Sequence, residues 1–415
     1  MLSALDFARR LESGELTPAQ AIELCAAAIA EREAEVGAFV TLDLDGARKA
    51  AQSAALKGKP LRGMPVALKD IFDTCDMPTE YGSRIYAGHR PRADSAPVAL
   101  TRAAGGVVLG KTVTCEFATF VPSRTRNPHN AAHTPGGSSS GSAAAVADFM
   151  VPLAFGTQTA GSVIRPGSYC GVVACKPTYN LLPRAGVHPN ADSLDTVGIY
   201  ARSVEDVAFF LEALTRRDDL HGEADRPRIG ACRTWEWELV EPSMAVAFET
   251  AARKLDAAEL RLPESFRSLR EAQGTIIRYE GARSLADEYR RYADRLDPAL
   301  RQRCEEGYAT DGRKYQQALL YAARCRAAVS EVFGDCDVLI APAATGEAPK
   351  GLGSTGNTAM NVVWTLLHVP CVSVPVGAGP NGLPLGLQVI GRIGDDARTL
   401  ACARWIEARM KDGRI

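Results

Sequence analysis

The stretch that decides the fold is residues 135–166, which read PGGSSSGSAAAVADFMVPLAFGTQTAGSVIRP. It opens with a glycine- and serine-rich loop that runs directly into an alanine-rich segment, residues 142–148, typical of a helix. A short apolar run at 151–155 predicts a buried strand, and a second loop of small residues follows it. A helix leading into a strand, with a glycine-rich loop on either side, indicates an α/β core whose loops carry the chemistry.

The same pattern extends outward along the chain. Further strands are predicted at 64–68, 107–109, 337–342, 370–376 and 385–390, and further helices in the first 35 residues, at 95–104 and at 397–410. Thr17 and Gln20 predict a capping box at the start of the second N-terminal helix, with Pro18 at its first position. Residues 242–333 are charged and rich in Arg, Glu and Ala, which predicts a helical excursion from the core.

Composition excludes several classes of protein. The 415 residues include 48 Lys and Arg against 49 Asp and Glu, a net charge of −1, whereas nucleic-acid-binding proteins normally carry a basic excess. The 11 cysteines are scattered without a CxxC pair, so we expect neither disulfides nor a metal site. Arg9, Arg10 and Glu12 break any signal peptide, and the apolar window 143–155 is too short to span a bilayer. We therefore expect a cytoplasmic protein without nucleic-acid or membrane partners.

Two familiar motifs lack the context that their function needs. Residues 105–112, GGVVLGKT, match the phosphate-binding P-loop pattern. A P-loop follows a strand and precedes a helix, but here the preceding segment is helical and the motif itself predicts a strand. Residues 137–141, GSSSG, match the nucleophile elbow of α/β-hydrolases around Ser139, but the residues upstream make a poor strand. A non-catalytic nucleotide-binding protein and an elbow hydrolase therefore stand as alternatives.

Three other segments together suggest a reaction. Lys69 ends the strand predicted at 64–68, and burial lowers the pKa of a lysine, so it is a candidate general base. The same residue also fits a lysine that reaches out to water. The loop 135–145 collects several serine hydroxyls at a helix start. Ser162 follows small residues whose amides can converge on an oxyanion, which makes it a candidate nucleophile.

In this order, a strand-end lysine, a GGSS loop and a later Gly-Ser turn resemble the amidase signature family of serine hydrolases. The downstream segments 170–178, CGVVACKPT, and 382–391, GLPLGLQVIG, extend the similarity over nearly the whole chain. Within the family, the segment 161–166, GSVIRP, is most similar to the malonamidase type. The resemblance implies an α/β fold with a central mixed, twisted β-sheet surrounded by α-helices.

The resemblance also implies the organisation of the chain. We expect a single amidase domain over 1–415, in which 1–60 form N-terminal helices, 61–200 the catalytic core and 240–335 the helical excursion. The walls of the substrate pocket should come in part from the helical region around 308–333. Relatives of this size are often dimers, so a homodimer is expected.

A Ser-Ser-Lys triad follows from the same resemblance. Ser162 matches the nucleophile, Ser138 the bridging serine on a cis peptide, and Lys69 the base, with Ser139 only a neighbour. The family's oxyanion hole consists of successive backbone amides, which fall here on Thr159, Ala160, Gly161 and Ser162. Ala160 replaces a common glycine and would be strained if that position needed a positive φ. Gln158 replaces an acidic residue found in many members.

Arg165 is the residue that bears on the substrate. An arginine three positions after the nucleophile is similar to malonamidase, where it reads a substrate carboxylate, and a guanidinium suits that task. Arginine in this loop is also a scaffold residue elsewhere in the family, and amidotransferase subunits carry it two positions after the serine.

We therefore expect an amidohydrolase without cofactor or metal that cleaves a small linear amide, malonamate-like, to carboxylate and ammonia. The alternatives are another small-amide or urea-type (carboxybiuret-like) amidohydrolase and a glutamine-hydrolysing amidotransferase subunit. The placement of Arg165 and the short chain speak against the amidotransferase subunit, which would need partner chains.

Overall fold

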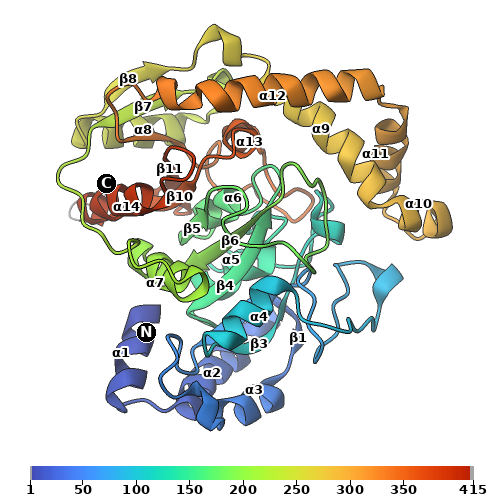
Figure 1. The fold of residues 1–415 in the computed structure, drawn as a ribbon, viewed down its shortest axis with the longest axis vertical. Coiled ribbons are helices and arrows are strands. Elements are labelled where there is room, and N and C mark those ends of the chain that lie inside the picture. Colours follow the sequence, from blue (N-terminus) through green and yellow to red (C-terminus); the bar gives the residue numbers. More distant parts are fainter. Residues whose placement is uncertain (1, 412–415) are drawn as a thin grey trace.

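The computed structural model describes residues 2–411, and its strands form one mixed sheet of 11 strands (Figure 1). The strands are β1 Phe39–Leu42, β2 Pro65–Lys69, β3 Val107–Thr112, β4 Leu153–Gln158, β5 Val173–Lys176, β6 Thr196–Ala201, β7 Ile229–Arg233, β8 Ala258–Arg261, β9 Val338–Pro342, β10 Cys371–Ala378 and β11 Pro384–Ile390. Their order across the sheet is β1-β3-β2-β4-β6-β5-β10-β11-β9-β7-β8. The predicted α/β fold with a central mixed sheet is confirmed.

Helices surround this sheet. They are α1 Ala4–Ser13, α2 Pro18–Val36, α3 Leu44–Ala51, α4 Ala96–Ala103, α5 Ser140–Ala147, α6 Ile164–Tyr169, α7 Val204–Thr215, α8 Pro242–Lys254, α9 Leu269–Ser284, α10 Ala286–Tyr292, α11 Pro298–Ala309, α12 Gly312–Val332, α13 Ala359–Leu366 and α14 Asp396–Lys411. No helix within residues 2–411 combines the length and the apolarity that crossing a bilayer requires.

The part of the sheet that positions the site contains β2, β3 and β4. β2 pairs in parallel with both β3 and β4, and every residue of the three strands is buried. Parallel strands buried on both faces read as continuous apolar runs, which is why the sequence revealed them. The carboxyl ends of these strands lie side by side at one end of the sheet, where ligand sites of open α/β sheets usually form.

Local sequence signals account for several elements. The side chain of Thr17 accepts from the Gln20 amide, and the Gln20 side chain accepts from the Thr17 amide, so the predicted capping box is present. α5 begins directly after the serine-rich loop, is almost entirely buried, and packs against β2, β3, β4 and β6. The serine loop is therefore held by a helix at the centre of the sheet.

Two predicted segments contain more than helices. Residues 1–60 include β1, which pairs with β3 at one edge of the sheet. The excursion at 240–335 includes β8, whose sequence AELR is mostly exposed at the opposite edge and has no apolar pattern. The one-domain prediction over 1–415 also covers residues 1 and 412–415, which lie outside the described residues.

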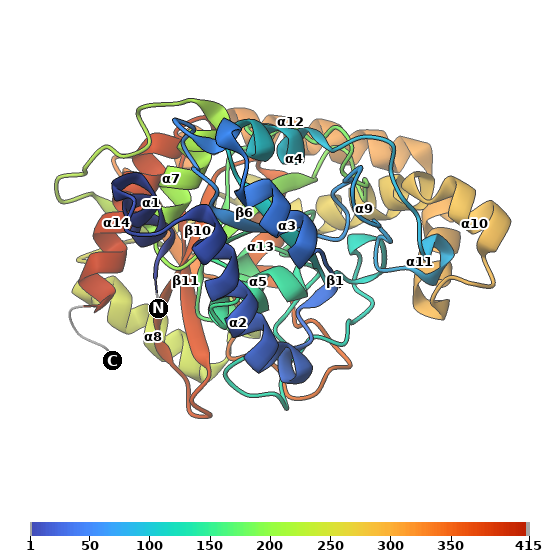
Figure 2. The ribbon, with the colours of Figure 1, turned by 90° about the horizontal axis from the view of Figure 1, so that it is seen from below.

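The helical excursion projects from the body of the molecule. In Figures 1 and 2, α9, α10 and α11 extend to one side, and α12 leads the chain back toward β9. α9 contacts α11, α12 and α13, so the projecting helices pack on one another and on the helix that precedes β10. This arrangement brings residues of α9 and α11 near the loop that follows β4.

Candidate active site

Lys69 lies at the carboxyl end of β2, beside the end of β4. The register pairs Leu68 with Phe155, which places Lys69 next to the last residues of β4. The side chain is completely buried, and its Nζ donates to Ser138 Oγ at 2.7 Å and to Thr157 Oγ1 at 2.9 Å. The structure therefore joins two of the three predicted catalytic residues directly.

Burial changes the acidity of this lysine. It lowers the pKa of Lys69 to about 7, from an ordinary value of 10.5, because the interior penalises the charged ammonium. Nearby Cys115 and Asp195 oppose that lowering. A large share of the Lys69 side chains is consequently neutral at neutral pH and able to accept a proton.

Ser138 lies in the loop before α5. The Gly137–Ser138 peptide bond is cis, as the family resemblance implies. The Ser138 carbonyl accepts from the Cys115 amide at 3.1 Å, and the Gly137 carbonyl accepts from the Arg165 guanidinium at 2.5 Å. The loop that presents Ser138 is therefore fixed by contacts on both sides of this bond.

The contacts of Arg165 bear on its two predicted roles, substrate binding and scaffold. Its guanidinium is buried and donates to the carbonyls of Gly137 and Gly356 and to the hydroxyl of Thr355, while its Nε is buried without a partner. These contacts tie the serine loop to the segment before α13. The geometry favours the scaffold role for Arg165 over the predicted contact with a substrate carboxylate, because its terminal nitrogens already bond the protein's own backbone.

Ser162 lies in the turn between β4 and α6, which Gln158 holds. The Gln158 Oε1 accepts from the amides of Val163 and Ile164, and its Nε2 donates to Thr365 Oγ1 at 2.9 Å. A carboxylate at this position would lack that donor. The replacement of an acidic residue by Gln158 is thus matched by a hydroxyl acceptor on α13.

The predicted oxyanion amides are available for a ligand. Within residues 2–411, the amides of Thr159, Ala160, Gly161 and Ser162 donate to no protein acceptor. Ala160 is not among the residues with positive φ, so the strain considered for alanine does not arise. A Cβ on Gly161 would lie 2.5 Å from the Asn361 side-chain oxygen, which explains glycine there.

Ser162 opens onto a small cavity. The cavity has a volume of about 240 Å³ and is lined by Ala118, Thr119, Phe120, Thr159, Ala160, Ser162, Asn190, Gln273, Ile277, Arg303 and Thr358. α9 provides Gln273 and Ile277, and α11 provides Arg303. The lining of this cavity includes no residue of 308–333, where part of the walls was expected. The helical excursion contributes through residues nearer its start.

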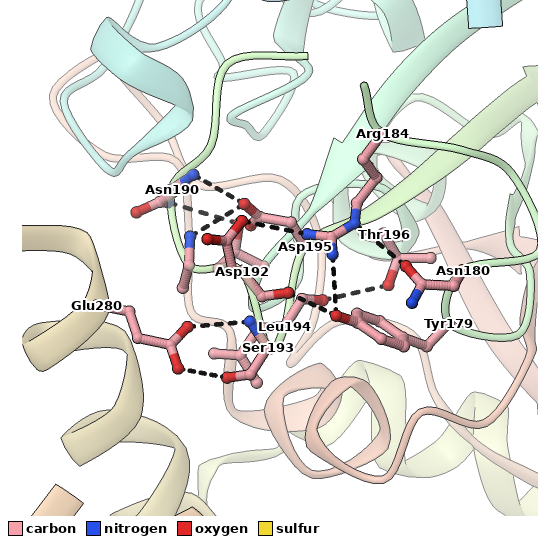
Figure 3. Close-up of polar contacts among 12 residues, drawn as sticks. Tyr179, Asn180, Arg184, Asn190, Asp192, Ser193, Leu194, Asp195, Thr196 and Glu280 are labelled. Carbon is pink, nitrogen blue, oxygen red and sulfur yellow. Dashed lines mark hydrogen bonds and ion pairs between the residues drawn. The ribbon is translucent and has the colours of Figure 1, made fainter. Parts of the chain in front are cut away.

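A polar cluster around Asp195 supports one wall of this cavity (Figure 3). The Asp195 carboxylate accepts from Thr159 Oγ1 and from the amides of Asn190 and Ala191 at 2.5–3.0 Å. Burial raises its pKa to about 6. From α9, Glu280 accepts from the amide and hydroxyl of Ser193. The loop that carries Asn190 is thereby fixed between the sheet and the helical excursion.

Neither rival motif forms its site. Lys111, the lysine of the P-loop pattern, lies within β3, and its Nζ is buried against the carbonyl of Phe72, the hydroxyl of Thr79 and the carboxylate of Asp70. Ser139 follows a loop, and its hydroxyl bonds the backbone of Thr157. Both side chains are used in packing the core. Among residues 2–411, no group of three or more His, Cys, Asp or Glu side chains is placed to hold a metal ion.

Comparison with known proteins identifies the family. The family model described as Amidase matches residues 20–400. The chain belongs to the amidase family. This amidase has the family fold predicted from its sequence, and it is a hydrolase of amide C–N bonds.

Three relatives illustrate the range of the match. A glutamyl-tRNA(Gln) amidotransferase subunit of Lachnospira eligens is 32% identical over 453 residues, with 94% of each chain covered. The 2-amino-5-chloromuconic acid deaminase of Comamonas testosteroni is 32% identical over 455 residues, covering 99% of this amidase and 97% of the deaminase. A structure of a "vestigial protein complex", described as revealing the origins of "an s-triazine catabolic enzyme", superposes with a TM-score of 0.90 at 28% identity, covering 99% and 98% of the two chains. The finer likeness to malonamidase stays a prediction.

Sequence reasoning missed several residues of this site. Thr157, the second partner of Lys69, lies inside the quoted stretch, and its position at a strand end was an available signal. Asn190 and Gln273 carry no motif. Arg303 lies in a helix whose sequence, PALRQRCEEGYA, also contains Arg301, and nothing local separates the two.

Proposed function

We propose that this amidase cleaves a small linear amide bearing a free carboxylate, malonamate-like, to a carboxylate and ammonia, using Ser162, Ser138 and Lys69. One observation carries the proposal: the buried amine of Lys69 bonds Ser138 at the same end of the sheet where Ser162 faces a cavity. A neutral amine beside a serine hydroxyl is the arrangement that activates a weak nucleophile.

The proposed reaction begins with proton transfer. Neutral Lys69 takes the proton of Ser138 as Ser138 takes that of Ser162, and Ser162 Oγ attacks the amide carbon. The oxyanion accepts from the open amides at 159–162, the proton passes to the departing nitrogen, and ammonia leaves an acyl-enzyme. Water then breaks the ester to release the carboxylate and restore Ser162.

One contact of this relay must form with substrate. Within residues 2–411, no hydrogen bond joins the hydroxyls of Ser138 and Ser162. The Ser162 backbone is held, because its carbonyl accepts from the Tyr200 hydroxyl at 3.0 Å, so rotation of the Ser162 side chain is the movement required. Catalytic hydrogen bonds often tighten only in the substrate complex.

The size of the cavity and the relatives support a small acidic amide. A cavity of about 240 Å³ is below the roughly 300–1,000 Å³ of sites for drug-sized ligands. The name of the deaminase relative specifies an acid. The structural relative is described through its link to an s-triazine catabolic enzyme, so a urea-type amide is an alternative within the same mechanism.

The amidotransferase relatives favour a second candidate, a glutamine-hydrolysing subunit. The chain is 32% identical to such a subunit, and the match covers 94% of each chain. The length of this chain is therefore no argument against the amidotransferase candidate. The arginine three positions after Ser162 remains the difference that the sequence offers. This candidate predicts that glutamine is hydrolysed efficiently only with partner chains present, whereas the favoured function needs this chain alone.

Ammonia release from the purified chain tests the proposal. Malonamate, a biuret-type amide and glutamine are compared with the wild type and with Ser162→Ala, Lys69→Ala and Ser139→Ala. We expect Ser162→Ala to abolish release, Lys69→Ala nearly to do so, and the control Ser139→Ala to keep most activity. A dead Ser139→Ala variant with a wild-type rate in Ser162→Ala would refute the triad. Glutamine hydrolysis that becomes efficient only when partner chains are added would favour the second candidate.

A further inference from the structure

The cavity beside Ser162 contains a cation that the catalytic mechanism does not use. Arg303 lies on α11 and lines this cavity together with Ser162. Its side chain is half-buried, not spread over the outer surface. A guanidinium remains protonated at any physiological pH, so the cavity holds one permanent positive charge from this side chain.

Neutral groups hold this guanidinium in place. Its Nη2 donates to the Asn190 side-chain oxygen at 3.0 Å and to the Ile277 carbonyl at 3.3 Å. Its Cζ lies 5.6 Å from the centre of the Phe120 ring. Asn190 is itself fixed through the Asp195 cluster (Figure 3), so the position of Arg303 is determined from both the core and α9.

No carboxylate of the described chain, residues 2–411, forms an ion pair with Arg303. The charge of Asp195 acts on Arg303, but the Asp195 oxygens accept from Thr159, Asn190 and Ala191. Arg278, a second cation nearby, adds to the positive potential. Within residues 2–411 the half-buried Arg303 guanidinium thus has no carboxylate partner, which leaves a place for an external anion.

The free donors of Arg303 are accessible. Its Nε and Nη1 have no acceptor within residues 2–411, and neither is among the nitrogens sealed from solvent. Arg165 is the opposite case, because its terminal nitrogens bond backbone carbonyls and its Nε is sealed. Of these two arginines, Arg303 is the one with donors left for a ligand.

We propose that Arg303 determines substrate specificity by pairing with a carboxylate of the small amide whose carbonyl Ser162 attacks. This inference rests on the proposed function and deepens it: the recognition of the substrate acid is assigned to a side chain of the helical excursion. A carboxylate bound by a charged donor gains a strong hydrogen bond, whereas a neutral amide of the same shape does not.

A matched pair of substrates tests this role. Malonamate and malonamide differ only in a carboxylate and a carboxamide. We expect Arg303→Gln to lower kcat/KM for malonamate by about 10- to 100-fold, mainly through KM, with malonamide changed less than threefold. Arg303→Lys, which keeps the charge, should restore part of the malonamate activity. Arg301→Gln, the same change on the exposed side of α11, is the control and should leave both substrates unaffected.

Binding of malonate supplies a readout that needs no turnover. Calorimetric titration should show saturable binding to the wild type and to Arg301→Gln, weakened at least tenfold in Arg303→Gln. Equal losses on both substrates, or malonate affinity unchanged in Arg303→Gln with a native circular dichroism spectrum, would overturn the inference. Absence of malonate binding to the wild type would also overturn it. Failure of the proposed function shows differently, as activity that survives Ser162→Ala.

Discussion

The pH dependence of the reaction tests the role of Lys69 most directly. Lowering its pKa from 10.5 to about 7 corresponds to a cost of about 5 kcal/mol for holding the charged form in the core, at about 1.4 kcal/mol for each tenfold change. Because the base must be neutral, kcat/KM should be level above pH 8 and fall about tenfold for each pH unit below 7.

The assay is ammonia release between pH 5 and 9 with malonamide, which carries no group that ionises in that range. A rate that stays constant from pH 6 to 8.5 would refute the assignment of Lys69 as the base. A profile centred near pH 10 would refute the argument from burial, because it would mean that the ammonium is well solvated.

The same charge has a signature in stability. Between about pH 7 and 10.5, Lys69 is protonated in the unfolded chain and neutral in the folded chain. The contribution of Lys69 to the free energy of unfolding of the wild type therefore rises with pH over this range. Lys69→Met removes that dependence. We expect the Lys69→Met variant to gain the most stability over wild type below pH 7. This gain in the free energy of unfolding should shrink toward pH 10. Parallel pH curves for the two proteins would contradict the reasoning. Asp195, whose pKa is about 6, titrates below this pH range.

Three further predictions follow from the contacts of the site and the fold. Gly161→Ala should lower kcat by about 100-fold in a folded protein, because the new Cβ would meet the Asn361 oxygen at 2.5 Å and displace an amide of the proposed oxyanion hole. A wild-type kcat in this variant would contradict the prediction. Arg165→Lys should reduce activity equally on malonamate and malonamide, and a loss confined to malonamate would return the carboxylate role to Arg165. Thr17→Ala should cost about 1 kcal/mol in urea unfolding with unchanged kcat/KM, since it removes only the α2 cap.

The sequence predicted elements best where local signals agree. α2 begins at Pro18 because the capping box and the proline are adjacent in the chain. β2 was expected at 64–68 and is found at Pro65–Lys69, because a buried parallel strand is a continuous apolar run. β8 has no such signal, since its AELR sequence is mostly exposed at the sheet edge and pairs only with β7. Its strand geometry comes from that neighbour.

Two strand lysines show why the site needed the tertiary structure. Lys69 and Lys111 are both buried, and both lie near the ends of apolar strands. The neighbouring residues in the sequence therefore do not distinguish a catalytic lysine from a structural one. The register pairs Lys111 with Leu68, so the two lysines point to opposite faces of the sheet. One meets Ser138, and the other meets Asp70. The partner, and hence the chemistry, depends on the face.

By itself, the sequence determined the family and the fold class, and it supplied the residues proposed for acyl transfer, because these depend on motifs with fixed local spacing. Only the tertiary structure decided which arginine has donors left for a ligand. Arg301 and Arg303 are two positions apart on α11 and therefore point to nearly opposite sides of the helix. The packing of α11 on α9 turns Arg303 toward the cavity, and the serine loop meanwhile engages Arg165. The directions of side chains across packed elements are set by contacts between distant segments, which no local pattern encodes.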